Sequence, residues 1–167
     1  MKNNETGTKN TTPALVAASV MIGIGMGGFI DGIVFHQVLQ WHEMISAILP
    51  PDTLLNKSVN MFWDGIFHLF TWTTTAIGIA MLWNYMKTQD ALRSNRILIG
   101  GCLAGFGLFN LVEGLIDHII LKLHNVKEVS DQKDFWNILF LLSGIILIAG
   151  GYLLIKSESK RNMKLVG

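Results

Sequence analysis

A short pattern of acidic and imidazole side chains occurs twice in this sequence, both times within apolar surroundings. Each copy has an acid, a glycine directly after it, and two histidines at fixed distances further along the chain. The copies are Asp31-Gly32 with His36 and His42, and Glu113-Gly114 with His118 and His124, so that every position recurs 82 residues later. Ionisable groups in a membrane are costly and usually functional. The pattern therefore predicts a polar functional centre.

A third acid and histidine pair, Asp64 and His68, stands between the two copies, one helical turn apart on the same face. With a rise of about 1.5 Å per residue, His36, His68 and His118 reach one common depth on three different helices. Three imidazoles in a dry layer suit a transition metal, with a coordination position left open. We expect these three histidines to be the primary ligands, and Asp64 to be a fourth ligand or to orient a ring.

The remaining ionisable residues are expected around this layer. Asp31 and Glu113 lie deeper, where carboxylates can orient the rings or bridge a second ion. On ideal helices, however, His36 and His118 point about 140° away from these acids. Either the helices deform at the glycines that follow the acids, or the acids form a separate layer. We expect a mouth of the site to be formed by His42, His124 and Asp117.

Composition places the chain among membrane proteins. Its 167 residues are 50% hydrophobic and 15% charged. The net charge of +1 gives no indication of a nucleic-acid-binding surface. A membrane-spanning helix needs about 20 predominantly apolar residues. Stretches of this kind lie near residues 14–42, 60–86, 96–123 and 134–155. The sequence predicts an all-α integral membrane four-helix bundle.

The repeated pattern also predicts the domain organisation. Phe62-Trp63-Asp64 resembles Phe135-Trp136-Asn137, so each half reads as a transmembrane hairpin, and we expect a parallel internal repeat. In the second half, Asn137 and Leu141 replace the acid and the histidine of the pair at 64 and 68. The expected parts are a disordered cytoplasmic tail at 1–12, a transmembrane domain at 13–156 with repeats at 13–87 and 95–156, and a cytoplasmic tail at 157–167.

Lysine and arginine are distributed unevenly over the ends of the expected helices. Nine lie in the N-terminus, the middle loop or the C-terminus, and four lie near the other two loops. By the positive-inside rule, both termini should be cytoplasmic in a multi-pass protein of the cell membrane. The acid and histidine pattern then falls in the outer half of the bilayer.

Three functions remain open at this point, with no catalytic residue assigned. The first is copper binding at the outer face, with zinc or iron as other candidate ions. The second is a membrane metalloenzyme, a hydrolase or an oxidase, which a lipid-sized cleft opening sideways would favour. The third is a proton or ion relay without metal, which the apolar inner halves of the helices disfavour.

Haem held by two histidines is a further possibility, and interhelical hydrogen bonding is the purely structural alternative. Such bonds contribute about 0.6–2 kcal/mol, less than the roughly 2.5–3.5 kcal/mol that inserting a charged residue such as Asp costs.

Three stretches carry a resemblance that extends from about residue 16 to residue 152: GFIDGIVFHQVLQWHEM, FWDGIFHLFTW and NLVEGLIDHIILKLH. Together they resemble a bacterial family of predicted membrane proteins, domain of unknown function 2243. The resemblance implies a four-helix integral membrane protein without an established activity. Some members of the family are fused to domains similar to copper-handling assembly factors of caa3-type oxidases. This association favours copper as the ion, and a respiratory oxidase or assembly factor as the partner. Glu43 departs from the family pattern, in which a histidine often follows His42.

Overall fold

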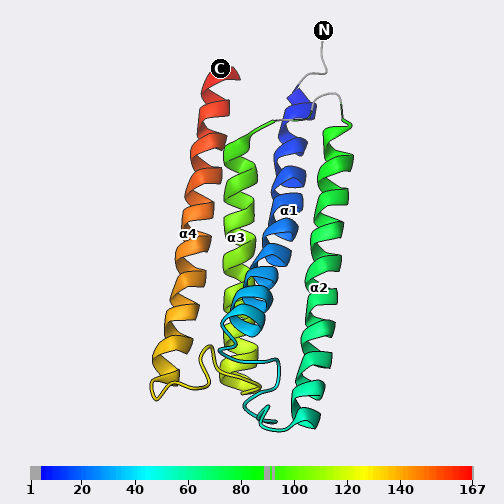
Figure 1. Cartoon of the computed structure of the whole chain (residues 1–167). Coiled ribbons are helices and arrows are strands. Elements are labelled where there is room, and N and C mark those ends of the chain that lie inside the picture. Colours follow the sequence, from blue (N-terminus) through cyan, green and yellow to red (C-terminus); the bar gives the residue numbers. More distant parts are fainter. Residues whose placement is uncertain (1–4, 89–90, 92, 167) are drawn as a thin grey trace.

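The computed structural model describes residues 5–88, 91 and 93–166, and these residues form four long helices and no strand (Figure 1). The α-helices are α1 (Glu5–Ile30), α2 (Leu54–Met86), α3 (Asn95–Glu113) and α4 (Lys133–Val166). Two π-helical segments, η1 (Asp31–Val38) and η2 (Gly114–Ile120), continue α1 and α3 directly. Both ends of the chain lie at one end of the molecule, and the two long loops lie at the other.

The helix bounds differ from the predicted ones at several ends. Helix α1 begins at Glu5, within the segment expected to be a disordered tail, of which residues 1–4 lie outside the described part. Helix α4 likewise continues to Val166. At the loop end the helical segments stop at Val38 and Ile120, earlier than the expected limits at 42 and 123. This early stop has consequences for the site.

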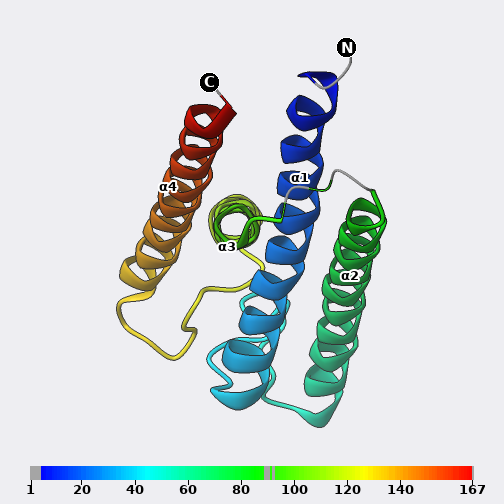
Figure 2. The same ribbon diagram turned by 90° about the horizontal axis from the view of Figure 1, so that it is seen from above.

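The helices pack in the order α2–α1–α3–α4, with α1 and α3 in the centre (Figures 1 and 2). Helix α2 packs along α1 and helix α4 packs along α3. Helix α2 also reaches α3 through side chains, since the rings of Phe67 and Phe109 lie 6.0 Å apart between centroids. The helix axes therefore form a row in which α1 and α3 each lie between two neighbours. The prediction of an all-helical protein with four helices able to span a membrane is confirmed.

Glycines allow the two central helices to approach closely. A Cβ atom at Gly23 would overlap the backbone of Cys102, and one at Gly105 would overlap the backbone carbonyl of Val20. Small residues at such crossings let helix backbones come together where the hydrophobic effect between helices is absent. This contact fixes α1 against α3, the two helices that carry the repeated pattern.

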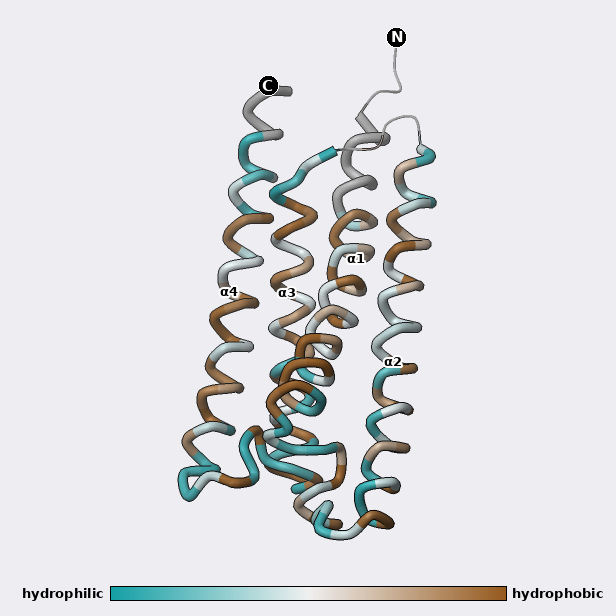
Figure 3. The backbone as a smooth tube through the Cα atoms, in the orientation of Figure 1, coloured by the Kyte–Doolittle hydropathy of each residue, from teal (hydrophilic) through white to brown (hydrophobic). Residues whose placement is uncertain are grey.

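The helix surfaces suit a hydrocarbon environment. Each of the ranges Pro13–Val38, Leu54–Met86, Asn95–Ile120 and Lys133–Arg161 is long and apolar enough to cross a membrane. Large apolar side chains such as Trp72 on α2 and Ile146 on α4 are exposed. Figure 3 shows apolar residues along the helices, and hydrophilic ones in the loops away from the termini, on the lower part of α2 and at the upper ends of α3 and α4. These helices would be in contact with lipid, as the sequence predicts.

Candidate metal centre

The π-helical segments bring an acid and a histidine onto the same face. In η1 the residues Asp31 and His36 are five positions apart, and Asp31 Oδ2 lies 2.9 Å from His36 Nε2. A π-helix closes its turn at i+5, whereas an ideal α-helix would point these side chains apart. Glu113 and His118 have the same spacing at the start of η2. Of the two alternatives left open by the sequence, the helices therefore deform.

Two left-handed residues then return the chain toward the helices. Gln40 has a φ of 48° and Lys122 a φ of 52°, a conformation uncommon for residues other than glycine. Directly after them, the backbone N–H of Trp41 donates to Phe35 O and that of Leu123 donates to Asp117 O. The two histidines that follow, His42 and His124, are 3% and 0% exposed. The histidines expected at the mouth are thus in the interior.

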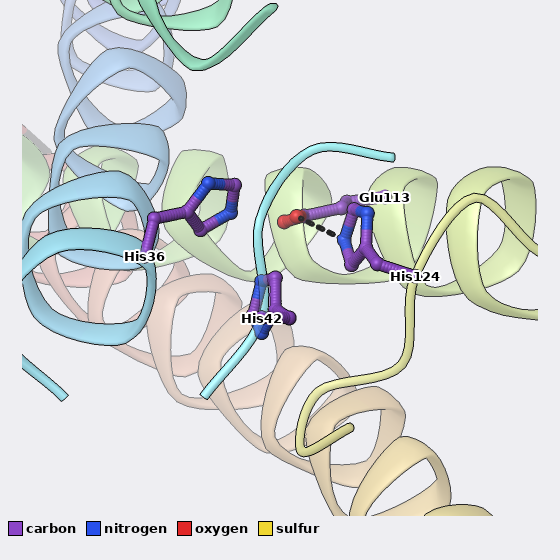
Figure 4. A group of neighbouring side chains, drawn as sticks. All are labelled: His36, His42, Glu113 and His124. Atoms are coloured by element: carbon purple, nitrogen blue, oxygen red, sulfur yellow. Dashed lines mark ion pairs between the residues drawn. The ribbon is translucent and has the colours of Figure 1, made fainter. Parts of the chain in front are cut away.

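Four buried residues from different segments form a compact group of ligand atoms (Figure 4). His36 comes from η1, His42 from the loop after it, Glu113 from the end of α3, and His124 from the loop after η2. One nitrogen or oxygen atom from each lies within 4.8 Å of the others. Such a group could hold a metal ion.

Each of the three histidines in this group has its Nδ1 atom engaged by an acceptor. His36 Nδ1 lies 2.9 Å from Asp64 Oδ1, His42 Nδ1 2.8 Å from Val126 O, and His124 Nδ1 2.9 Å from Met44 O. A carbonyl oxygen only accepts hydrogen bonds, so Nδ1 of His42 and of His124 carries the proton. In a neutral ring the lone pair is then on Nε2. Partners of this kind commonly fix the tautomer of metal-binding histidines.

The atoms that face the centre of the group lack hydrogen-bond partners. Within the described part of the chain this holds for Nε2 of all three histidines and for Oε2 of Glu113. The Asp31 Oδ2 atom lies 2.9 Å from His36 Nε2, which makes an ion pair when the His36 ring is doubly protonated. Buried polar atoms are nearly always satisfied, and exceptions call for an explanation such as an ion. The donor set of three imidazoles and a carboxylate fits a transition metal.

His124 has a protonation state that suits a ligand. Burial lowers the pKa of this imidazole well below its ordinary value, and the nearby rings of His42 and His118 lower it further. Metal binding requires a neutral imidazole. At neutral pH, His124 is therefore already in the form that binds a metal.

The structure groups the predicted ligands differently from the sequence-based expectation. His36 is joined by His42 and His124, and not by His68, whose Nδ1 donates to the backbone carbonyl of Asp64 in its own helix. Asp64 instead orients His36. The expectation rested on straight helices that end at the level of His42, whereas the left-handed turns bring the loop histidines back between the helices.

The other predicted residues surround the group. His118 is buried, and its ring centroid lies 4.8 Å from that of His124. Asp31 Oδ2 lies 3.8 Å from His42 Nε2. Asp117 is half-buried and lines, together with Glu113, a groove of about 490 Å³ between α2 and α3. The rest of that groove is apolar, with residues such as Trp63, Phe67, Phe70, Leu108 and Phe109.

Sequence reasoning did not identify several groups that support the site. The backbone carbonyls of Met44 and Val126 could not be recognised, because the types of these two side chains do not indicate a hydrogen-bond acceptor. Asn137, noted only as the counterpart of Asp64, accepts the backbone N–H of Val126 at 3.0 Å, as Asp64 accepts that of Met44 at 2.9 Å. The matched positions of these pairs in the two halves were the available signal.

Fold and site together define a multi-helix membrane protein with a buried histidine and carboxylate cluster at one end of its helices. The chain belongs to the predicted membrane protein family DUF2243, whose family model matches residues 18–158. No curated protein and no solved structure matches the chain.

Proposed function

We propose that this membrane protein binds a first-row transition metal ion through His36, His42, His124 and Glu113. The observation that carries the proposal is the orientation of the three rings. Each Nδ1 is engaged by an oxygen, and each Nε2 lies, unpartnered within the described residues, in a group that also contains the Glu113 carboxylate. This pre-organised donor set is what an imidazole-ligated ion requires.

We propose copper(II) as the first ion to test. The four ligands offer nitrogen and oxygen and no sulfur, which suits copper(II), zinc or iron better than copper(I). Copper(II) has the highest affinity of these ions for a site of given nitrogen and oxygen donors. The family resemblance supports the same choice, with a respiratory oxidase or an assembly factor as the proposed partner.

A cleft at the loop end supports exchange of the ion with the surroundings. It has a volume of about 460 Å³, and its lining includes His42, Glu43, Lys57 and Glu128. His42 thus belongs both to the ligand group and to the wall of the cleft. With the termini placed in the cytoplasm by the positive-inside rule, this cleft would open on the outer face of the cell membrane.

We further propose that residues 13–87 and 95–156 are two copies of one hairpin, related by a two-fold axis between α1 and α3. Reciprocal contacts support this relation. His42 bonds the carbonyl of Val126 while His124 bonds that of Met44, so donor and acceptor are both displaced by 82 residues. The crossings of Gly23 with Cys102 and of Gly105 with Val20 follow the same rule.

A membrane metalloenzyme is the second candidate function, favoured by the apolar groove between α2 and α3. The groove lies along membrane-spanning segments, and Glu113 is part of both the groove and the ligand group. An apolar substrate from the bilayer would therefore reach the metal from the side. Glu113 would then hold the ion or accept a proton from a metal-bound water.

The test of metal binding is the metal content of detergent-purified protein after incubation with copper(II) and removal of loosely bound ions. We expect stoichiometric copper in the wild type and its loss in His42→Ala and in His124→Ala. His68→Ala is the matched control, because His68 lies outside the ligand group, and it should retain the ion.

Two results would contradict the proposal. Loss of copper in His68→Ala with retention in His42→Ala would restore the ligand set expected from the sequence. Absence of metal from every folded sample, also with zinc or iron(II), would leave a doubly protonated His36 bridging Asp31 and Asp64 as the account of the same contacts.

A further inference from the structure

The ligand group of four residues does not use all the metal-binding side chains that are buried beside it. It takes His36 and His42 from the first copy of the pattern, and Glu113 and His124 from the second. Asp31 and His118 are left over. Asp31 is 2% exposed and His118 is 3% exposed, so neither is solvated.

The contacts of Asp31 are with the rings of the ligand group itself, 2.9 Å from His36 Nε2 and 3.8 Å from His42 Nε2. Both carboxylate oxygens of Asp31 and both ring nitrogens of His118 lack a hydrogen-bond partner among the described residues. Burial of an unpaired polar group costs free energy, and burial of an unpaired carboxylate costs considerably more. Two further ligands of this kind are more than a single four-coordinate ion would use.

The two copies of the pattern group the six residues into two sets, one from residues 31–42 and one from residues 113–124. In the first set, Asp31 Oδ2 lies 2.9 Å from His36 Nε2 and 3.8 Å from His42 Nε2. Ligand atoms about 2.0–2.1 Å from one tetrahedral ion are roughly 3.4 Å from each other, which these separations bracket.

The second set consists of Glu113, His118 and His124. Glu113 Oε1 lies 3.6 Å from His124 Nε2, and the rings of His118 and His124 are 4.8 Å apart between centroids. The two sets are in contact, because the rings of His42 and His124 stack with a centroid separation of 4.5 Å.

The charge of the surroundings is compatible with two ions when a hydroxide is also bound. Three buried carboxylates, those of Asp31, Asp64 and Glu113, lie around the rings. None of them forms an ion pair with a lysine or arginine of the described residues. One divalent cation would leave a net negative charge in a low-dielectric site. Two divalent cations would exceed the three carboxylates by one positive charge, which a bound hydroxide would balance.

We propose that the site holds two divalent transition-metal ions, one bound by Asp31, His36 and His42 and the other by Glu113, His118 and His124. Each ion has two imidazoles and one carboxylate, a set that leaves coordination positions open for an exogenous ligand. This inference rests on the proposed metal binding and extends it to a two-metal centre, in which the ions of known examples are about 3.5–4 Å apart.

The test is a titration of the metal-free full-length protein with copper(II), followed by metal analysis and electron paramagnetic resonance. We expect two copper ions per chain in the wild type. Because the ions are close, magnetic coupling should reduce the integrated signal well below the amount of bound copper. In His118→Ala, we expect one ion per chain with full signal intensity.

Controls make the outcomes distinguishable. Asp31→Asn is nearly isosteric and should also bind one uncoupled ion, which protects the test against misfolding of His118→Ala. His68→Ala should keep two coupled ions, and the double variant His42→Ala/His124→Ala reports adventitious binding. One ion per chain in the wild type, unchanged in His118→Ala and in Asp31→Asn, would overturn the second site and leave the proposed function intact. No bound ion in the wild type would overturn both.

Discussion

The imidazole rings of His42 and His124 stack face to face, with centroids 4.5 Å apart and planes inclined by 3°. Each ring donates through Nδ1 to a backbone carbonyl two residues beyond the other histidine, His42 to Val126 and His124 to Met44. The two long loops therefore hold each other in place, and they do so through the same residues whose Nε2 atoms belong to the proposed metal site. Loop order and metal binding should be coupled in this molecule.

The first prediction is that metal removal loosens these loops. An ion would link His42 and His124 in the loops to His36 and Glu113 in the helices. At a metal concentration of about 100 times Kd, binding stabilises the closed form enough to make opening roughly 100-fold rarer. Hydrogen exchange of peptides covering 39–53 and 121–132 should therefore slow strongly when metal is added. Peptides from the start of α3, at the opposite end, serve as the control, and equal slowing there would argue against a local effect.

The second prediction concerns Asp64, which accepts from His36 Nδ1 and from the backbone N–H of Met44. In Asp64→Asn the side chain keeps its shape but loses its charge. The amide therefore orients the His36 ring, and raises the basicity of that ring, less effectively than the carboxylate. We expect metal affinity to fall about 10–100-fold, as measured by competition with a chelator. The exposed Asp131→Asn is the matched substitution and should leave the affinity unchanged. An unchanged affinity in Asp64→Asn would remove Asp64 from the support of the site.

Much of the site could be predicted from the sequence because the spacing of the acids and histidines is itself repeated. Asp31, His36, Glu113 and His118 were placed on the correct helical segments, and the glycines after the acids suggested a deformation. The position of His42 and His124 could not be obtained in this way. It depends on left-handed conformations at Gln40 and Lys122, and glutamine and lysine do not indicate such a conformation in a sequence.

The arrangement of the helices was predicted only in part. Apolar composition and length identify four membrane spans, since hydrophobic length is a local property of the sequence. Which helices pack together is decided by close contacts such as that between Gly23 and the backbone of Cys102, over 70 residues away in the chain. All four long helices contain glycines, and at Gly65 a Cβ atom would meet nothing within 4 Å, so that composition alone does not distinguish a crossing glycine from one that faces open space.

The third prediction follows from that contact. A Cβ atom at Gly23 would overlap the backbone of Cys102, which cannot move aside as a flexible side chain could. We expect Gly23→Ala to reduce stability by at least about 1–3 kcal/mol, seen as earlier thermal unfolding in detergent. At Gly150 a Cβ atom would meet nothing within 4 Å in the described structure. Gly150→Ala should therefore be neutral or stabilising by up to about 1 kcal/mol. Equal stability of the two variants would contradict the assigned crossing.

The fourth prediction is the orientation of the protein in the membrane. Val129, in the loop beside the site, is 82% exposed, and Ser157 is exposed on α4 near the opposite end. With nine of thirteen lysines and arginines at the end of the termini, the positive-inside rule places the site outside. In intact cells a membrane-impermeant maleimide should label Val129→Cys and not Ser157→Cys, and after lysis it should label both. The chain already contains Cys102, which lies within a membrane-spanning segment. Labelling of the wild-type protein under the same conditions measures the contribution of Cys102 to the signal. The reverse labelling pattern would place the proposed metal site on the cytoplasmic side. The ion would then come from the cytoplasm, and a partner on the outer face could not reach the cleft at His42.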